Sequence, residues 1–138
     1  MSKWLPVLLW SALIFLASSN PDPNKSLPPR WTEPCLTTLP ASQSCAELLG
    51  RFLHVTEYAI LAALTARAMI GKEAIEISRL FLILGLIMVY ALSDEVHQWF
   101  VLGRSFQLLD LGFDLLGALI GLFILSIHAR NSPSKDII

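Results

Sequence analysis

Ionisable side chains interrupt an otherwise apolar stretch of this sequence, ALSDEVHQWFVLGRSFQLLDLGFDLLGALIG, which runs from Ala91 to Gly121. Its charged residues are Asp94, Glu95, Arg104, Asp110 and Asp114. Carboxylates can orient a general base or bind a divalent cation, and a guanidinium fork fits phosphate or carboxylate. Charge is costly in apolar surroundings, so these residues are candidates for a functional site.

A second group of polar residues lies in RFLHVTEY, where His54, Glu57 and Tyr58 are three or four positions apart and share one helix face. The candidate catalytic residues are His54, Asp94, Glu95 and His97, with a histidine acting as general acid or base. The candidate binding residues are Arg104, Gln98, Asp110, Asp114 and Tyr58. His97 has a second interpretation, exposure near the lipid head groups, because Trp99 follows it closely.

The sequence predicts no cofactor and no metal. Histidines and carboxylates share one layer, but no H-E-x-x-H or C-x-x-C spacing fixes a metal site. Glycine-rich phosphate loops, the dinucleotide fingerprint and the nucleophile elbow are also missing from the sequence. Ser93 and Ser105 flank the acids, yet nothing in the sequence activates either as a nucleophile.

The composition places these residues in a membrane protein. The chain has 138 residues, of which 54% are hydrophobic and 15% charged, and this predicts a small integral membrane protein. A net charge of -1 gives no basic surface for nucleic acid, which we exclude as a partner.

Four apolar segments predict an all-α, four-helix antiparallel membrane bundle that forms a single domain over residues 1–138. The expected helices cover about 4–19, 52–70, 79–99 and 107–127, and a proline-rich outer loop covers 20–50. The first segment also resembles a signal peptide, and we favour a retained helix. Short connections make neighbouring helices antiparallel.

The antiparallel order puts every intramembrane acid in the same half of the bilayer. Asp114 should lie about 10 Å below the surface of the hydrocarbon core and face another helix. Arg104, in the predicted turn, is the expected counter-ion of the acids. Gly117 and Gly121 form a small-xxx-small pattern that could serve packing inside the bundle or between two copies of the chain.

Lysine and arginine positions favour both termini in the cytoplasm, in a multi-pass membrane protein. This orientation places the acids in the outer half of the membrane. It also places Cys35 and Cys45 on the outer face, where a disulfide between them and two free thiols are both compatible with the sequence.

The order of these motifs resembles the VanZ-like family of small bacterial membrane proteins, named for an accessory factor in teicoplanin resistance. The resemblance runs through SSNP, RFLHVTEY, ALSDEVHQWFVLGRS and LLDLGFDLLGALIGL. It maps the family pattern onto His54, Asp94, Glu95, Gln98, Gly103, Arg104, Asp110 and Gly117. Asp114 stands where the family usually has Asn, and Gly50 with Arg51 stand where an Asp-Lys pair is common.

The resemblance implies a four-helix membrane protein, and it does not by itself assign a role in resistance. From the polar cluster we expect binding of a lipid head group or a lipid-linked envelope precursor. The resemblance adds the bacterial cytoplasmic membrane as the expected location and an effect on teicoplanin susceptibility. Two alternatives remain open: a membrane-embedded hydrolase or transferase acting on such a substrate, and an ion-pair network that only fixes helix packing. The sequence leaves open whether the protein is an enzyme.

Overall fold

Four helices account for most of the described chain. The computed structural model describes residues 2–21, 45–71 and 75–131, and the side chains of 45, 46, 130 and 131 are not described. The helices are α1 (Leu5–Ser18), α3 (Cys45–Ile70), α4 (Ile77–Phe100) and α5 (Leu108–Asn131). The predicted all-α fold with four helices is therefore confirmed.

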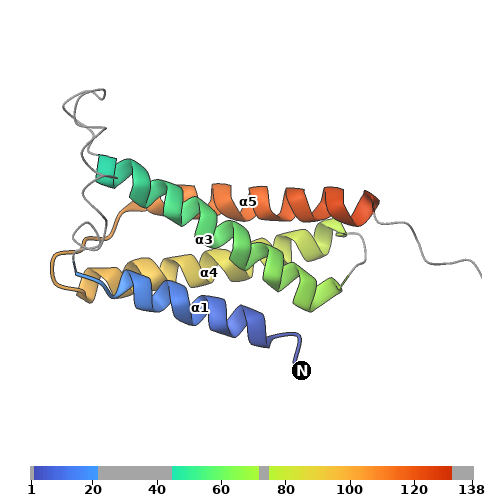
Figure 1. The fold of residues 1–138 in the computed structure, drawn as a ribbon, viewed down its shortest axis with the longest axis horizontal. Helices are drawn as coiled ribbons and strands as arrows, with labels where there is room; N and C mark the ends of the chain where they lie inside the picture. The colour runs from blue at the N-terminus through green and yellow to red at the C-terminus, as the bar shows by residue number, and fades with distance from the viewer. Residues whose placement is uncertain (1, 22–44, 72–74, 132–138) are drawn as a thin grey trace, which may run out of the picture.

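Consecutive helices run antiparallel along one long axis, so α1 and α4 point one way and α3 and α5 point the other (Figure 1). Helices α1 and α4 end, and α3 and α5 begin, at the same end of the bundle, which we call the polar end. The turn between α4 and α5 closes this end, and Gly103 in it has a φ of +86°, a left-handed conformation that favours glycine. A Cβ atom on Gly103 would lie 3.1 Å from the carbonyl oxygen of Pro21, so the chain leaving α1 packs against this turn.

Helices α3, α4 and α5 are each long and apolar enough to cross a membrane, whereas α1 is shorter. Its 14 residues span about 21 Å, less than the ~30 Å of a hydrocarbon core. Pro6 lies in its first turn, and Pro21 follows its last residues, where a proline disfavours further helix. The predicted helix at about 4–19 and the observed α1 are therefore both shorter than the ~20 residues that a full membrane span needs.

Helix α3 begins at Cys45, seven positions earlier than the predicted start at residue 52. Glu47 in its first turn complements the helix dipole, and Arg51 follows at the i,i+4 spacing that suits an ion pair. A glycine in a helix interior costs only about 1 kcal/mol, so Gly50 does not stop the helix. The proline-rich segment is correspondingly shorter than expected at its C-terminal end.

The closest helix contact joins α3 and α5 through two glycines. A Cβ atom on Gly117 would collide with the backbone carbonyl of Val55, and one on Gly121 with the carbonyl of Ala59. Both glycines are buried. The small-xxx-small pattern thus serves packing within the chain, and we call this contact the glycine seam.

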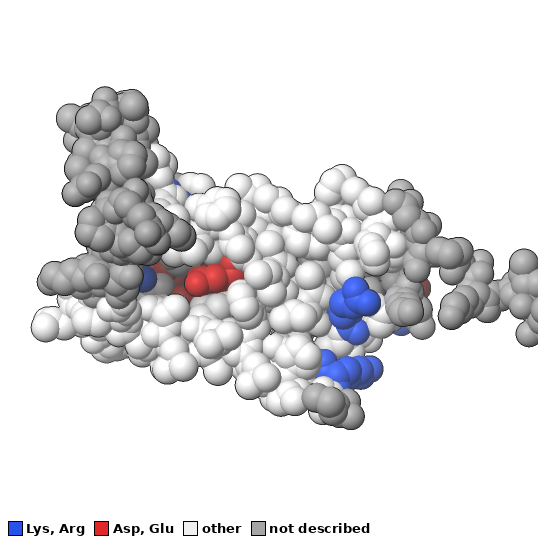
Figure 2. Space-filling model, viewed as in Figure 1, with Lys and Arg blue, Asp and Glu red and all other residues white. Residues whose placement is uncertain are grey.

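A small apolar core lies between the helices, and the outer surface is also apolar. Core residues include Ile14, Leu61, Ile83 and Leu122, while large side chains such as Phe81 and Val89 are exposed. On the face in Figure 2, most of the visible acidic surface lies in one small area toward the polar end with a few basic atoms near it, and the larger basic side chains lie toward the opposite end. An apolar exterior around a few buried polar groups fits a lipid environment.

The chain is a multi-pass membrane protein by its three long apolar helices. Its orientation in the membrane stays a prediction. The pairing of Cys35 with Cys45 lies outside the described residues.

Candidate functional site

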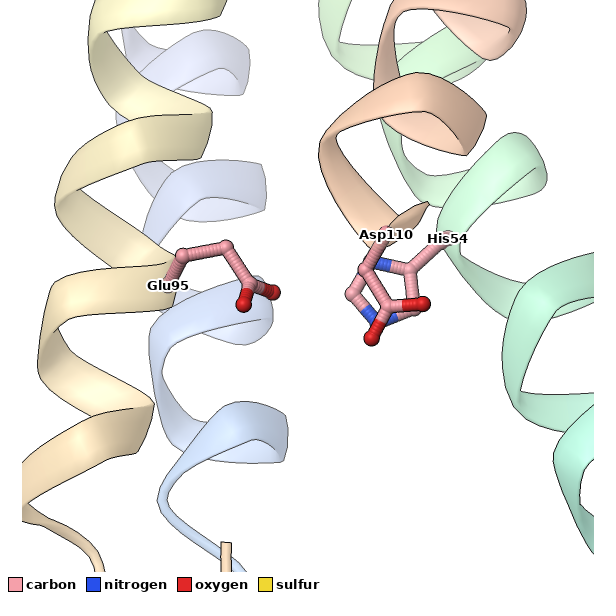
Figure 3. A group of neighbouring side chains, drawn as sticks. All are labelled: His54, Glu95 and Asp110. Carbon is pink, nitrogen blue, oxygen red and sulfur yellow. The ribbon is translucent and has the colours of Figure 1, made fainter. Parts of the chain in front are cut away.

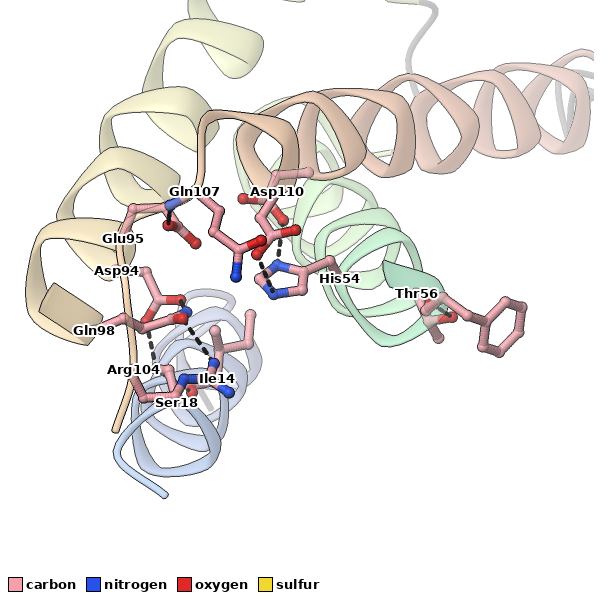
Figure 4. Close-up of polar contacts among 12 residues, drawn as sticks. Ile14, Ser18, His54, Thr56, Asp94, Glu95, Gln98, Arg104, Gln107 and Asp110 are labelled. Atoms are coloured by element: carbon pink, nitrogen blue, oxygen red, sulfur yellow. Dashed lines mark hydrogen bonds and ion pairs between the residues drawn. The ribbon is translucent and has the colours of Figure 1, made fainter. Parts of the chain in front are cut away.

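The polar end encloses the buried polar side chains that the sequence predicted to converge. Asp94, Glu95 and Gln98 of α4 and Asp114 of α5 are all buried, together with Ser18 at the end of α1. Figure 4 shows Ser18 on α1 and Asp94, Glu95 and Gln98 on α4 among the polar contacts between the helices. Their contacts divide them into two groups with different hydrogen-bonding status.

The first group, which we call the Asp94 network, consists of Ser18, Asp94, Gln98 and Arg104. Ser18 Oγ donates to Asp94 Oδ1, and Gln98 Nε2 donates to Asp94 Oδ2 at 3.0 Å. Arg104 Nη2 donates to Gln98 Oε1 at 2.7 Å. Both oxygens of the buried carboxylate therefore have donors, and the network joins α1, α4 and the following turn.

Arg104 reaches the acids differently from the prediction. Among the described residues its hydrogen bond goes to the amide oxygen of Gln98, and no carboxylate described forms an ion pair with it at 4.0 Å or less. The direct counter-ion role expected for Arg104 is thus replaced by contact through Gln98. The amide oxygen of Gln98 accepts from the guanidinium and the amide nitrogen donates to Asp94. Arg104 therefore polarises the amide group that bonds the acid.

The second group, which we call the His54 group, consists of His54, Glu95, Asp110 and Asp114. His54 Nδ1 lies 2.8 Å from Asp114 Oδ1, and His54 Nε2 lies 3.9 Å from Asp110 Oδ2. One ligand atom from each of His54, Glu95 and Asp110 lies within 4.8 Å of the others. Figure 3 shows the Glu95 carboxylate of α4 directed toward His54 of α3 and Asp110 of α5.

The His54 group contains polar atoms that the described protein leaves without hydrogen-bond partners. Glu95 Oε2 accepts from the backbone N–H of Gln107 at 2.9 Å, but Glu95 Oε1 has no partner among the described residues. Asp114 Oδ2 and the Tyr58 hydroxyl are also buried and unpartnered there. A buried polar atom without a partner costs stability. These three atoms could therefore form hydrogen bonds with a ligand.

His97 lies apart from the His54 group. Its ring stacks on Phe15 of α1 with centroids 4.2 Å apart, and its Nε2 shares a hydrogen bond with Ser19 Oγ at 3.0 Å. The histidine therefore belongs to the contact between α1 and α4, where α1 is further held by a hydrogen bond from Tyr90 Oη to the Ser11 carbonyl. The structure does not bring His97 to the other catalytic candidates.

Several contributors to the site are absent from the sequence-based candidates. Ser18 and Ser19 bond to Asp94 and His97, and the backbone N–H of Gln107 bonds to Glu95. The motif SSNP signalled the two serines, because paired hydroxyls at the end of an apolar helix can meet acids at the same depth. A backbone donor leaves no such signal in the sequence.

The two groups differ in what they can do chemically. In the Asp94 network both carboxylate oxygens have donors, so the network fixes the relative positions of α1, α4 and the following turn. The His54 group offers one imidazole nitrogen and several carboxylate oxygens in one place, a set suited to accepting hydrogen bonds or coordinating a cation. The side chains of His54 and Asp110 are 12% and 13% exposed, so this group can be reached from outside the bundle.

Comparisons with known proteins assign a family to the chain. Searches of curated proteins and of solved structures found no significant match. The profile of one family, VanZ/LLP1, matches residues 3–129, which include all four helices except the last two residues of α5. This four-helix membrane protein with a buried histidine and carboxylate cluster belongs to the VanZ/LLP1 family.

Proposed function

We propose that the polar end binds the polar head group of a membrane lipid or of a lipid-linked envelope precursor. The observation that supports this proposal is the set of buried, unpartnered atoms Glu95 Oε1, Asp114 Oδ2 and Tyr58 Oη. Both oxygens of Asp94 have donors, whereas these three atoms have no partner among the described residues. Buried polar atoms without partners favour a ligand that supplies hydrogen bonds or positive charge.

Access to the site favours a lipid over a water-soluble ligand. The cluster is largely buried, while residues close to it in sequence, such as Phe52, Leu109 and Leu116, are exposed apolar side chains. A ligand with an acyl or polyprenyl chain can cover this apolar surface while its head group reaches the polar end.

The chemistry of the two groups indicates what the head group carries. Carboxylates of the His54 group accept hydrogen bonds from hydroxyl or amine groups. Arg104 uses one nitrogen for Gln98, and its guanidinium has further N–H groups of the geometry that fits phosphate. A head group combining phosphate with hydroxyl or amine groups would therefore engage both.

A lipid retention experiment tests the proposal. The protein is purified in mild detergent or nanodiscs, and the retained lipids are identified by native mass spectrometry. We expect one class of polar lipid with the wild-type chain and at least a tenfold loss in Glu95→Gln and Arg104→Ala. Arg67→Ala removes an exposed arginine near the end of α3 away from the site and should retain the lipid.

The proposal fails if the folded wild-type protein retains no lipid class selectively, or if Arg67→Ala loses the lipid as strongly as Arg104→Ala. Each variant is checked for the wild-type helical circular dichroism and elution volume before lipids are compared. Differences in retention then report on the polar end rather than on unfolding.

Hydrolysis or group transfer is a second candidate function, favoured by the contact between His54 Nδ1 and Asp114 Oδ1. A carboxylate that accepts a hydrogen bond from one imidazole nitrogen orients the ring, so that the other imidazole nitrogen can act as a general base. Converted lipid should then accumulate with wild-type protein and not with His54→Gln.

Membership of a family named for teicoplanin resistance extends the proposal to antibiotic response. We expect expression of the chain to reduce the teicoplanin susceptibility of a sensitive bacterium, and Glu95→Gln to abolish that change.

A further inference from the structure

We propose that His54, Glu95 and Asp110 bind a divalent transition-metal ion at the polar end. The three side chains come from three helices, α3, α4 and α5. One ligand atom from each lies within 4.8 Å of the other two, and Figure 3 shows the three groups facing one another. The geometry of the three side chains supports the metal site by itself. A role for the ion in binding a lipid head group rests on the proposed function.

The spacing suits coordination after a small side-chain movement. Two ligands at about 2.1 Å from a tetrahedral ion lie roughly 3.4 Å apart. Donor atoms within 4.8 Å of one another can reach this spacing by rotations of the glutamate and aspartate side chains.

Contacts outside the three donors match those that orient metal ligands. A histidine that binds metal usually donates its other ring N–H to a carboxylate. His54 Nδ1 lies 2.8 Å from Asp114 Oδ1, which leaves Nε2 as the nitrogen on the Asp110 side. Asp114 thus acts as a positioning residue for His54.

Glu95 provides the independent observation that points to a ligand. Its side chain is 0% exposed, the Gln107 N–H fixes one carboxylate oxygen, and the other has no partner among the described residues. That carboxylate is directed at His54 and Asp110 in Figure 3. A fully buried glutamate with one oxygen fixed and the other open is poised to coordinate a cation.

The charge balance supports a cation at this position. Glu95, Asp110 and Asp114 converge on a single imidazole, and buried carboxylates repel one another unless they are protonated or paired. A divalent ion offsets two of these charges at once. It would also present positive charge to the phosphate of a bound head group.

The donor set selects the class of metal. One imidazole nitrogen with two carboxylate oxygens suits Zn²⁺, Mn²⁺ or Co²⁺ better than Mg²⁺ or Ca²⁺, which prefer all-oxygen sites. Three protein ligands also leave a coordination position open, as in sites where the metal contacts a substrate.

Cobalt titration of the full chain tests the inference. The protein is purified through a tag without histidine and stripped with chelator. Co²⁺ is then added while its visible d–d absorption is followed, and Zn²⁺ is added to displace it. We expect saturation at one equivalent per chain, loss of the signal in His54→Gln and Glu95→Gln, and binding about 10–100-fold weaker in Asp114→Asn.

Two controls separate this site from other ligands. His97→Gln removes an imidazole at the same end that contacts Phe15 and Ser19 instead, and it should bind Co²⁺ as the wild type does. A chain with Cys35→Ser and Cys45→Ser removes thiolates that compete for metal and should give the same saturation. Each variant must show wild-type thermal unfolding before its titration is compared.

Absence of Co²⁺ binding by the folded wild type would overturn the inference, and so would binding that survives Glu95→Gln but is lost in His97→Gln. Lipid retention by metal-free protein would then leave the proposed function standing without the metal. Stoichiometric metal binding without any selective lipid would leave the metal site standing and remove the proposed function.

Discussion

Asp94 and Asp114 are both buried carboxylates at the polar end, yet their surroundings differ. Asp94 has donors on both oxygens, while Asp114 has His54 on one oxygen and no described partner on the other. Satisfied polar groups stabilise and orient, whereas unsatisfied ones cost stability until something binds them. At the scale of residues, then, the polar end combines a structural network with a binding group.

Removing the middle of the Asp94 network should destabilise the protein. Gln98→Ala leaves Arg104 and one oxygen of Asp94 without the partners they have now. We expect a loss of about 1–3 kcal/mol in the free energy of unfolding, measured by thermal unfolding in detergent. Ser93→Ala is the matched control, because the Ser93 hydroxyl bonds only within its own turn and is exposed. Equal stability of the two variants would contradict the structural role of the network.

The two tyrosines provide a second comparison at this scale. Tyr90 Oη donates to the Ser11 carbonyl at 2.6 Å, so Tyr90→Phe should cost about 0.5–1.5 kcal/mol. Tyr58 Oη is buried without a described partner, so Tyr58→Phe should leave the stability of ligand-free protein unchanged or raise it. Lipid added to the protein should stabilise Tyr58→Phe less than the wild type. Strong destabilisation of ligand-free Tyr58→Phe would show that its hydroxyl has a structural partner.

Among the elements, the glycine seam sets the distance across the His54 group. His54 precedes Val55, whose carbonyl faces Gly117, and Asp114 lies one turn before Gly117 on α5. The seam therefore lies one turn from the contact between His54 and Asp114. Helices held this close keep an imidazole and a carboxylate within hydrogen-bonding distance without long side chains.

Widening the seam should weaken both packing and binding. Gly117→Ala introduces a Cβ atom into the backbone of Val55, and such overpacking costs about 1–3 kcal/mol. It should also lower the Co²⁺ affinity by separating His54 from Asp114. Gly112→Ala adds a Cβ atom in open space on the same helix and should gain up to about 1 kcal/mol through helix propensity. Thermal unfolding measures the change in stability, and Co²⁺ titration measures the change in affinity. Equal stability and equal Co²⁺ affinity of the two variants would contradict the role of the glycine seam.

The sequence predicted the helices and their antiparallel order because apolar length and short connections determine them. It also predicted that acids would share one layer, since that follows from helix order alone. It could not predict that His54 pairs with Asp114, or that Arg104 contacts Gln98. Those contacts depend on how each helix is rotated about its axis, and on the backbone approach at Gly117 and Gly121. The position of His97 was ambiguous for the same reason.

For the molecule as a whole, two exposed aromatic residues and an exposed leucine near the turn between α4 and α5 indicate how deep the polar end lies. Trp99, Phe100 and Leu102 are 67%, 80% and 90% exposed. Tryptophan and other aromatic side chains are typical of the boundary between lipid and water. The buried acids of α4 precede these residues by one turn, so the His54 group should lie just below the head-group level.

Reporter fusions test the orientation of the whole protein. With both termini in the cytoplasm, a green fluorescent protein fused after Ile138 should fluoresce, and alkaline phosphatase fused there should be inactive. A phosphatase fused after Ser105, in the turn at the polar end, should be active because that turn faces outward. The opposite pattern would place the polar end on the cytoplasmic side while leaving the arrangement of its residues unchanged.

The apolar exterior around a largely buried cluster also determines the concentration scale on which a ligand's affinity is measured. A lipid ligand arrives by diffusion within the plane of the membrane, so its concentration is a mole fraction among lipids and does not depend on the volume of water. Binding is then a competition against the bulk lipids that otherwise fill the same surface. A site that distinguishes its ligand only by the head group can be occupied with a modest preference, provided that the ligand is not rare in its leaflet.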